Sequence, residues 1–274
     1  MEKLKEKVEI LEKEFSVNLF QVFKDEFIEA LNNGIVRAAE KSANGDWIVN
    51  AWVKKGILLL FRFGKIRDYS VPGFSFFDKD TLPPKKISIE NRIRIVPGGS
   101  SIRTGCFIAP GVIIMPPCYV NIGAFVDADS LLDSHSLVGS CAQIGKRVHL
   151  SASAQIGGVL EPIGARPVII EDDVFIGGNC GIYEGVLIRQ QAVIASGVIL
   201  TSSTKVFDIV NQNILQSTEK TPLEIPPRAV VVPGSRQLKG EFPEKYGLSI
   251  YSPIIVKYRD EKTDAKSTLE NILR

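Results

Sequence analysis

The chain has 274 residues, with 33 Lys and Arg against 31 Asp and Glu, which leaves a formal net charge of +2. Hydrophobic residues make up 45% and charged residues 23% of the chain, so extensive disorder and a collagen-like repeat are excluded. The balanced charge does not indicate a nucleic-acid-binding protein. No stretch approaches the roughly 20 apolar residues of a membrane-spanning helix.

The first 95 residues are predicted to form a small α-rich domain. Two helices are indicated by apolar residues that share a helical face: Leu4, Val8, Leu11 and Phe15, then Val22, Phe23, Phe27 and Leu31. A turn signal at 44–46 follows. The segment 47–63 is interpreted as a helix or strand and then a buried strand over the apolar run 56–63.

A six-residue repeat dominates the middle of the chain. An aliphatic residue stands at every sixth position from Val96 to Ile156, and again from Ile170 to Val206. Four residues after these, a second track carries small or β-branched residues. The spacing suits neither a helix nor an alternating strand, and it predicts a parallel β-helix with short strands as its flat sides. Three units close one triangular coil, so the two runs predict about six coils, stacked about 4.8 Å apart.

Two segments interrupt the repeat, at 157–167 and 207–223, and both are predicted to project as loops, where binding sites usually lie. The β-helix is therefore expected over 96–235, with a C-terminal segment over 236–274. Within that segment, 247–259 alternates like a strand and 267–274 is compatible with a short helix.

The four cysteines show no C-x-x-C pair, so we expect reduced thiols and a cytoplasmic protein. Cys106, Cys118 and Cys180 lie on the small inward track and are interpreted as apolar fillers. Cys141 falls between the tracks, which leaves a nucleophile open there. Only His135 and His149 are available as histidine ligands, so a three-histidine metal site is excluded and no metal is expected.

A β-helix by itself implies no reaction, but segments along nearly the whole chain resemble the tetrahydrodipicolinate N-succinyltransferases, a family of hexapeptide-repeat acyltransferases. The segments are DWIVNAWVKK at 46–55, FFDK at 76–79, VNIGAFVD at 120–127, VGSCAQIGK at 138–146, VHLS at 148–151, IGGVLEP at 156–162, STKVFD at 203–208 and IIVK at 254–257. The resemblance includes segments outside the repeat, so it is more specific than the six-residue pattern.

The resemblance implies a mainly β fold built on a left-handed β-helix, and a homotrimer with active sites between subunits. It implies transfer of a succinyl group from succinyl-CoA to the amine of L-2-amino-6-oxopimelate in lysine biosynthesis. Succinyl-CoA would be a co-substrate, with no tightly bound cofactor. Two alternatives remain open: an acetyl-CoA-dependent N- or O-acetyltransferase on the same scaffold, and a non-catalytic trimeric scaffold.

Site residues carry over from the resemblance at matching positions. Asp133 matches the catalytic or substrate-binding aspartate, and a carboxylate suits the deprotonation of an attacking amine. Arg94 matches a substrate-contacting arginine, suited to a dicarboxylate, and His135 lies close to Asp133 in sequence. Residues expected to bind the CoA thioester are Gly157, Gly158, Ser203, Lys205, Lys257 and Lys266. Each charged residue among these is also compatible with an ordinary solvated surface position.

One position departs from the family pattern. Familiar members carry a glutamate, paired with the catalytic aspartate, where this chain has Gly181 in GGNCGIYEGV at 177–186. Glu184 matches a second family glutamate and is the other predicted catalytic residue. Either Glu184 or His135 takes the part of the missing acid, or the enzyme works mainly through Asp133 and positioning.

Overall fold

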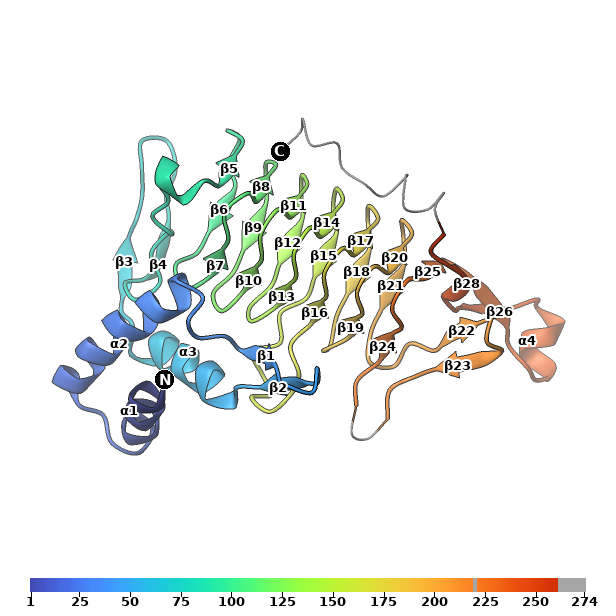
Figure 1. Ribbon diagram of the computed structural model, residues 1–274, viewed down its shortest axis with the longest axis horizontal. Helices are drawn as coiled ribbons and strands as arrows, with labels where there is room; N and C mark the ends of the chain where they lie inside the picture. The colour runs from blue at the N-terminus through green and yellow to red at the C-terminus, as the bar shows by residue number, and fades with distance from the viewer. Residues whose placement is uncertain (219–220, 261–274) are drawn as a thin grey trace.

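The computed structural model describes residues 1–218 and 221–260. Short strands stack in successive coils along the long axis, with α1, α2 and α3 beside the first coils and α4 at the opposite end (Figure 1). Within the described ranges, no helix is long and apolar enough to cross a membrane. The predicted fold class, a left-handed parallel β-helix behind an α-rich N-terminal domain, is confirmed.

Three sheets form the sides of the β-helix. Sheet I consists of β7 (Phe107–Ile108), β10 (Phe125–Val126), β13 (Gln143–Ile144), β16 (Ile169–Ile170), β19 (Leu187–Ile188) and β24 (Glu224–Ile225). Sheet II begins with β5 (Arg94–Ile95), β8 (Ile113–Ile114), β11 (Leu131–Leu132), β14 (His149–Leu150), β17 (Phe175–Ile176), β20 (Val193–Ile194) and β25 (Ala229–Val232). Sheet III consists of β6 (Ser101–Ile102), β9 (Tyr119–Val120), β12 (Leu137–Val138), β15 (Gln155–Ile156), β18 (Gly181–Ile182) and β21 (Ile199–Leu200).

The register confirms the predicted triangular coil. Val126 pairs in parallel with Ile144, and Leu132 pairs with Leu150, so one coil takes 18 residues. The aliphatic residue of each strand points inward, and Leu132 and Ile144 are fully buried. Burying such a side chain contributes about 1.5–3 kcal/mol. The repeat therefore builds a continuous core along the whole β-helix.

The N-terminal domain contains α1 (Glu2–Lys13), α2 (Val17–Asn32), α3 (Ala51–Phe63), the hairpins β1 (Ala39–Lys41)–β2 (Trp47–Val49) and β3 (Ile66–Asp68)–β4 (Phe77–Lys79), and a 3-10 turn at Ile89–Asn91. The strand predicted over 56–63 is wrong, because this segment belongs to α3. Gly56 lets α3 approach α2: a Cβ there would lie 2.6 Å from the Phe27 ring. Val22, predicted on the apolar face of α2, is 50% exposed.

Residues between α2 and α3 cover the outer face of sheet I. The Arg37 guanidinium stacks 3.5 Å from the Phe125 ring centroid and donates a hydrogen bond of 3.0 Å to Gln143. The Trp47 indole donates a hydrogen bond of 2.9 Å to Glu171, which is buried. These contacts fix the N-terminal domain on one side of the β-helix.

The far end of the β-helix is closed by three more strands of sheet II: β22 (Val206–Asp208), β23 (Asn213–Leu215) and β28 (Ile254–Tyr258). Beyond them lie β26 (Ser235–Gln237), α4 (Glu241–Lys245) and β27 (Ser249–Tyr251). The prediction of one strand over 247–259 is wrong: β27 pairs with β26, whereas β28 pairs with β22 and β25. The helix expected at 267–274 lies outside the described residues.

Candidate active site

A cavity of about 440 Å³ lies where the segment 157–167 leaves the corner between sheets III and I. Its lining residues are Gly157, Gly158, Val159, Glu161, Pro162, Ala165, Tyr183, Glu184 and Ser202. The structure thus brings together three residues predicted from sequence, namely Gly157, Gly158 and Glu184. A second cavity of about 480 Å³ shares Ala165, Glu184 and Ser202 with it and also borders Ser217 of the segment 207–223. Both interruptions of the repeat therefore contribute to one corner.

The two glycines are required by packing inside the chain. A Cβ on Gly158 would lie 2.6 Å from the backbone nitrogen of Ser140 on the preceding coil. A Cβ on Gly157 would lie 2.7 Å from Cδ1 of Tyr183. Both distances are shorter than any normal carbon contact, so glycine is needed for the coils to meet at this corner.

Glu184 links two consecutive coils at the corner. It adopts a left-handed backbone conformation (φ 53°), which costs a non-glycine residue about 1 kcal/mol, and its side chain is exposed. Its Oε2 accepts hydrogen bonds from the backbone nitrogen of Ser202, at 3.0 Å, and from the Ser202 hydroxyl. Ser203, predicted to contact CoA, follows directly, and its hydroxyl lies 3.1 Å from that of Thr201.

The segment 157–167 is anchored from two sides. Lys54 of α3 is fully buried and donates a hydrogen bond of 2.6 Å to the carbonyl oxygen of Ala165. Burial lowers the pKa of Lys54, and the nearby Cys141 partly opposes this. Arg166 pairs with Glu224 of β24 and donates a hydrogen bond of 3.0 Å to the Gly185 carbonyl. The cavity therefore has walls fixed by the N-terminal domain and by sheet I.

Asp133 and His135 lie at a different corner, between sheets II and III. Asp133 follows β11 and is half-buried, and its Oδ1 accepts a hydrogen bond of 2.7 Å from the Ser134 nitrogen. His135 is exposed at φ 63°, and its carbonyl accepts a hydrogen bond of 2.9 Å from the Gln155 amide. The two residues are adjacent, as predicted, but sheet III separates them from Glu184 within one chain.

His149, which was not predicted as a site residue, lies close to Asp133. His149 points outward on β14, beside Leu131, and its ring meets Phe175 edge-on at 4.9 Å between centroids. Burial lowers the pKa of His149, while the nearby Asp133 charge opposes this shift. The repeat could have identified His149. It lies 18 positions after Leu131, so it stands beside Leu131 on the next coil, and Leu131 is two residues before Asp133.

The remaining predicted residues are dispersed. Arg94 lies exposed on sheet II, two strands before β11 and so about 10 Å from it. Lys205 is exposed at the end of the last coil, close in sequence to Ser203. Lys257 on β28 forms an ion pair of 3.0 Å with Asp260. Lys266 lies outside the described residues.

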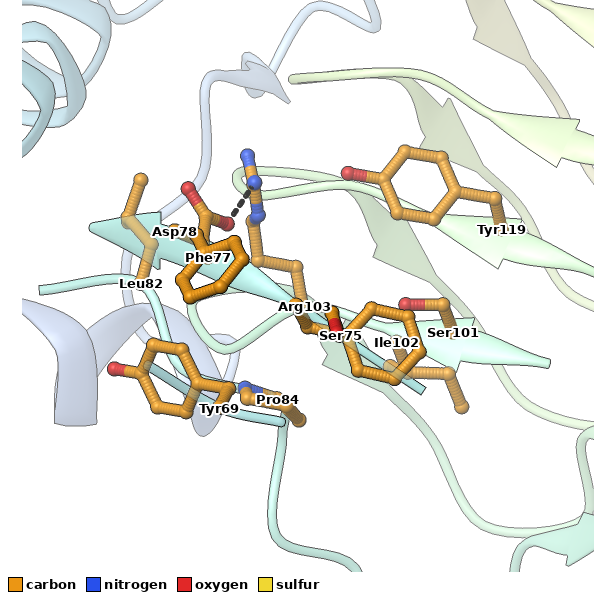
Figure 2. A pocket seen from close by; sticks show the side chains of 11 residues that line it. Tyr69, Ser75, Phe77, Asp78, Leu82, Pro84, Ser101, Ile102, Arg103 and Tyr119 are labelled. Atoms are coloured by element: carbon orange, nitrogen blue, oxygen red, sulfur yellow. Dashed lines mark hydrogen bonds and ion pairs between the residues drawn. The ribbon is translucent and has the colours of Figure 1, made fainter. Parts of the chain in front are cut away.

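A separate cavity of about 590 Å³ lies between the β3–β4 hairpin and sheet III. Figure 2 shows Arg103 reaching Asp78 there, with Tyr119 and Ser101 on the side of the β-helix. Because Asp78 already neutralises Arg103, this cavity offers no unpaired cation for an acidic ligand. None of the residues predicted from sequence lines it.

Neither a metal centre nor a cysteine nucleophile is supported by the described residues. Over residues 1–218 and 221–260, no group of three or more His, Cys, Asp or Glu side chains could hold a metal ion. Cys141 is fully buried against the N-terminal domain, and burial raises the pKa of its thiol to about 12. A thiolate is therefore strongly disfavoured at the one cysteine that could have been a nucleophile.

The coils built from three six-residue units, together with the corner cavity, define a member of the hexapeptide-repeat class. The family described as "Hexapeptide repeat of succinyl-transferase" matches residues 167–202, and "Tetrahydrodipicolinate N-succinyltransferase N-terminal" matches residues 10–63. Among curated relatives, 2,3,4,5-tetrahydropyridine-2,6-dicarboxylate N-succinyltransferase of Ehrlichia ruminantium is 47% identical over 261 residues, covering 91% of this chain and 86% of the relative.

The protein of the same name from Coxiella burnetii (strain Dugway 5J108-111) is 48% identical over 252 residues, covering 90% of this chain and 87% of the relative. That of Nitrobacter hamburgensis is 43% identical over 263 residues, covering 91% and 88%. The chain belongs to the 2,3,4,5-tetrahydropyridine-2,6-dicarboxylate N-succinyltransferase family.

Proposed function

We propose that this protein transfers the succinyl group of succinyl-CoA to the amine of L-2-amino-6-oxopimelate, the ring-opened form of tetrahydrodipicolinate, in lysine and diaminopimelate biosynthesis. The observation that carries the proposal is the similarity to relatives of that name over about nine tenths of the chain, at 42–48% identity. Family models match both the N-terminal domain, at residues 10–63, and the repeat, at residues 167–202, so the similarity extends beyond the six-residue pattern.

The reaction requires an amine to attack the thioester carbonyl. A C–N bond forms, the C–S bond breaks, the amine proton passes to a base, and the CoA thiolate leaves and takes up a proton. Asp133 is the proposed base or amine-positioning group. It is half-buried, and its Oδ1 accepts the Ser134 hydrogen bond, which leaves Oδ2 to accept the amine proton. Arg94 and His135 are proposed to contact the substrate carboxylates, because Arg94 lies on the sheet that carries Asp133.

The corner cavity is proposed to receive the acyl-CoA arm. Gly157 and Gly158 expose backbone there, and Ser203 and Lys205 lie at the end of the adjoining coil. Lys257 is proposed to meet the nucleotide phosphates as a point charge, and Lys266 completes the predicted set. Glu184 stabilises this wall of the cavity by accepting a hydrogen bond from the backbone nitrogen of Ser202. No tightly bound cofactor is proposed, because succinyl-CoA is consumed as a co-substrate.

A homotrimer with sites between subunits is part of the proposal. The chain covers the outer face of sheet I itself, whereas sheets II and III carry partly exposed apolar residues such as Phe175, Leu137 and Ile199. Two partly uncovered sides suit a closed ring in which each copy meets two neighbours. Such packing would bring Asp133 of one copy towards the corner cavity of the next. The four free cysteines suit a reducing compartment, so a cytoplasmic location is included in the proposal.

The testing experiment compares thiol release from succinyl-CoA and from acetyl-CoA in the presence of the amino-oxopimelate substrate. The proposal predicts substrate-dependent release that is much faster with succinyl-CoA. Faster release from acetyl-CoA would identify an acetyltransferase instead. No release from either thioester, with no CoA binding by calorimetry, would support a non-catalytic scaffold.

A further inference from the structure

The outer face of Gly181 is covered by the ring of Tyr183. A Cβ built on Gly181 would lie 2.4 Å from Cε2 of Tyr183 and 2.8 Å from both Cζ and the hydroxyl oxygen. Gly181 is in extended β18 and has no positive φ, so its backbone would accept a side chain. The Tyr183 ring therefore occupies the space that a side chain at position 181 would enter.

Two glycines create the slot for this ring. A Cβ on Gly157 would lie 2.7 Å from Tyr183 Cδ1 and 3.3 Å from its Cα, at the base of the side chain. Gly181 faces the opposite end, near the hydroxyl. The tyrosine therefore runs from the corner between sheets III and I onto the outer face of sheet III, with its polar end at position 181.

The hydroxyl is available for a ligand. Tyr183 is half-buried and lines the corner cavity with Glu184 and Ser202. Among the described residues, no hydrogen bond satisfies its hydroxyl group, although a tyrosine hydroxyl donates and accepts readily. The packing thus places a polar atom without a side-chain or backbone partner among the described residues on the outer face of sheet III, beside the cavity.

The two residues that could otherwise supply a polar group at position 181 are held elsewhere. One Glu184 oxygen is bound by the backbone and hydroxyl of Ser202, on the neighbouring coil. His135 lies at the corner between sheets II and III, where its backbone is tied to Pro117 and Gln155. The group that lies over Gly181 is therefore the Tyr183 hydroxyl.

We propose that Tyr183 is a catalytic residue whose hydroxyl donates a hydrogen bond to the thioester carbonyl oxygen as that oxygen gains negative charge. The inference rests on the proposed acyl transfer. The donor is fixed by the glycine slot before the reaction begins, so it need not reorganise when the charge develops. No proton is transferred to or from Tyr183 in this role.

The first test is Tyr183→Phe, which keeps the ring in its slot and removes only the hydroxyl. We expect kcat for succinyl transfer to fall at least about tenfold, the lower end of the effect of a hydrogen bond to a charged group. KM for succinyl-CoA and the melting temperature should stay close to those of the wild type. The matched control is Tyr119→Phe, a tyrosine of the same sheet outside the corner cavity, which should keep wild-type kcat.

The second test exchanges the positions. Tyr183→Val empties the slot, and Gly181→Gln in the same chain then places an amide N–H donor over the same strand. If a hydrogen-bond donor at this position matters, the double variant should recover at least part of the kcat lost in Tyr183→Val. A Tyr183→Phe protein with kcat reduced less than tenfold would overturn the inference. Absence of succinyl transfer by the wild type would instead overturn the proposed function, so the two failures are distinguishable.

Discussion

Nζ of Lys54 donates a hydrogen bond of 2.6 Å to the carbonyl oxygen of Ala165, which ties α3 of the N-terminal domain to the segment 157–167. Lys54 has no exposed surface, so this bond forms in the interior, where a charged donor strengthens it. Ala165 lines both cavities at the corner between sheets III and I. The N-terminal domain therefore shapes the proposed acyl-CoA site without contributing its reacting groups.

Replacing Lys54 by Met should loosen this segment more than it destabilises the fold. The lost hydrogen bond involves a charged group, so amide exchange over 157–167 should accelerate about tenfold or more. The melting temperature should change little, because removing a buried charge offsets the loss. Lys55→Met is the matched control, since Lys55 forms a surface ion pair with Glu12. Equal exchange rates in the wild type and Lys54→Met would show that other contacts hold the segment.

Asp133→Asn should reduce kcat by at least about 100-fold, the usual contribution of a general base. The amide oxygen still accepts the Ser134 hydrogen bond, so the melting temperature should be preserved. Asp127→Asn is the control, because Asp127 makes the same contact to its following nitrogen, at 2.8 Å, but at another corner. Normal turnover by a folded Asp133→Asn protein would remove Asp133 from the mechanism.

His149 should make stability fall in mild acid. Burial lowers its pKa from the usual 6.5, so below that pH the unfolded chain takes up a proton before the folded chain does. The free energy of unfolding should therefore decrease as pH falls through 6.5 towards the folded pKa, and less so in His149→Gln. Urea unfolding at several pH values measures this.

NMR titration should show a further lowered His149 pKa in Asp133→Asn, and an unchanged value would show that the two groups are not coupled.

The four cysteines should resist thiol reagents until the protein unfolds. All four are free and buried, and burial raises the pKa of Cys106 and Cys141 to about 12. Few thiolates exist at neutral pH under these conditions. A disulfide reagent should label none of them rapidly in the native protein and four in urea. Rapid native labelling of Cys141 would contradict its placement beneath the N-terminal domain.

The β-helix could be predicted from sequence because its geometry repeats. Each inward position is fixed by the same corner spacing, so Leu132 and Leu150 were placed without knowledge of distant contacts. The α3 helix could not be recognised, since an apolar run such as 56–63 is compatible with a buried strand or helix. The packing of this segment against α2, which requires Gly56, favours the helix over the strand.

The candidate site was predictable only in part for a related reason. Gly157, Gly158 and Glu184 were predicted from the family resemblance, and the structure places them together because they occupy successive turns of one corner. Tyr183 was missed, because its importance depends on two glycines that leave room for its ring, and no motif marks such a slot. Asp133 lies at another corner, so its proposed meeting with the cavity requires a second copy of the chain.

Acyl transfer is proposed to occur where Asp133 of one copy meets the corner cavity of the next. The most direct measurement mixes two impaired proteins, Asp133→Asn and the double variant Tyr183→Phe with Glu184→Gln, after unfolding and joint refolding. If sites lie between copies, random equal mixing restores an intact pair at about one quarter of the sites, measured as thiol release from succinyl-CoA. Turnover no higher than the average of the two parents, in oligomers shown to contain both chains, would contradict the claim.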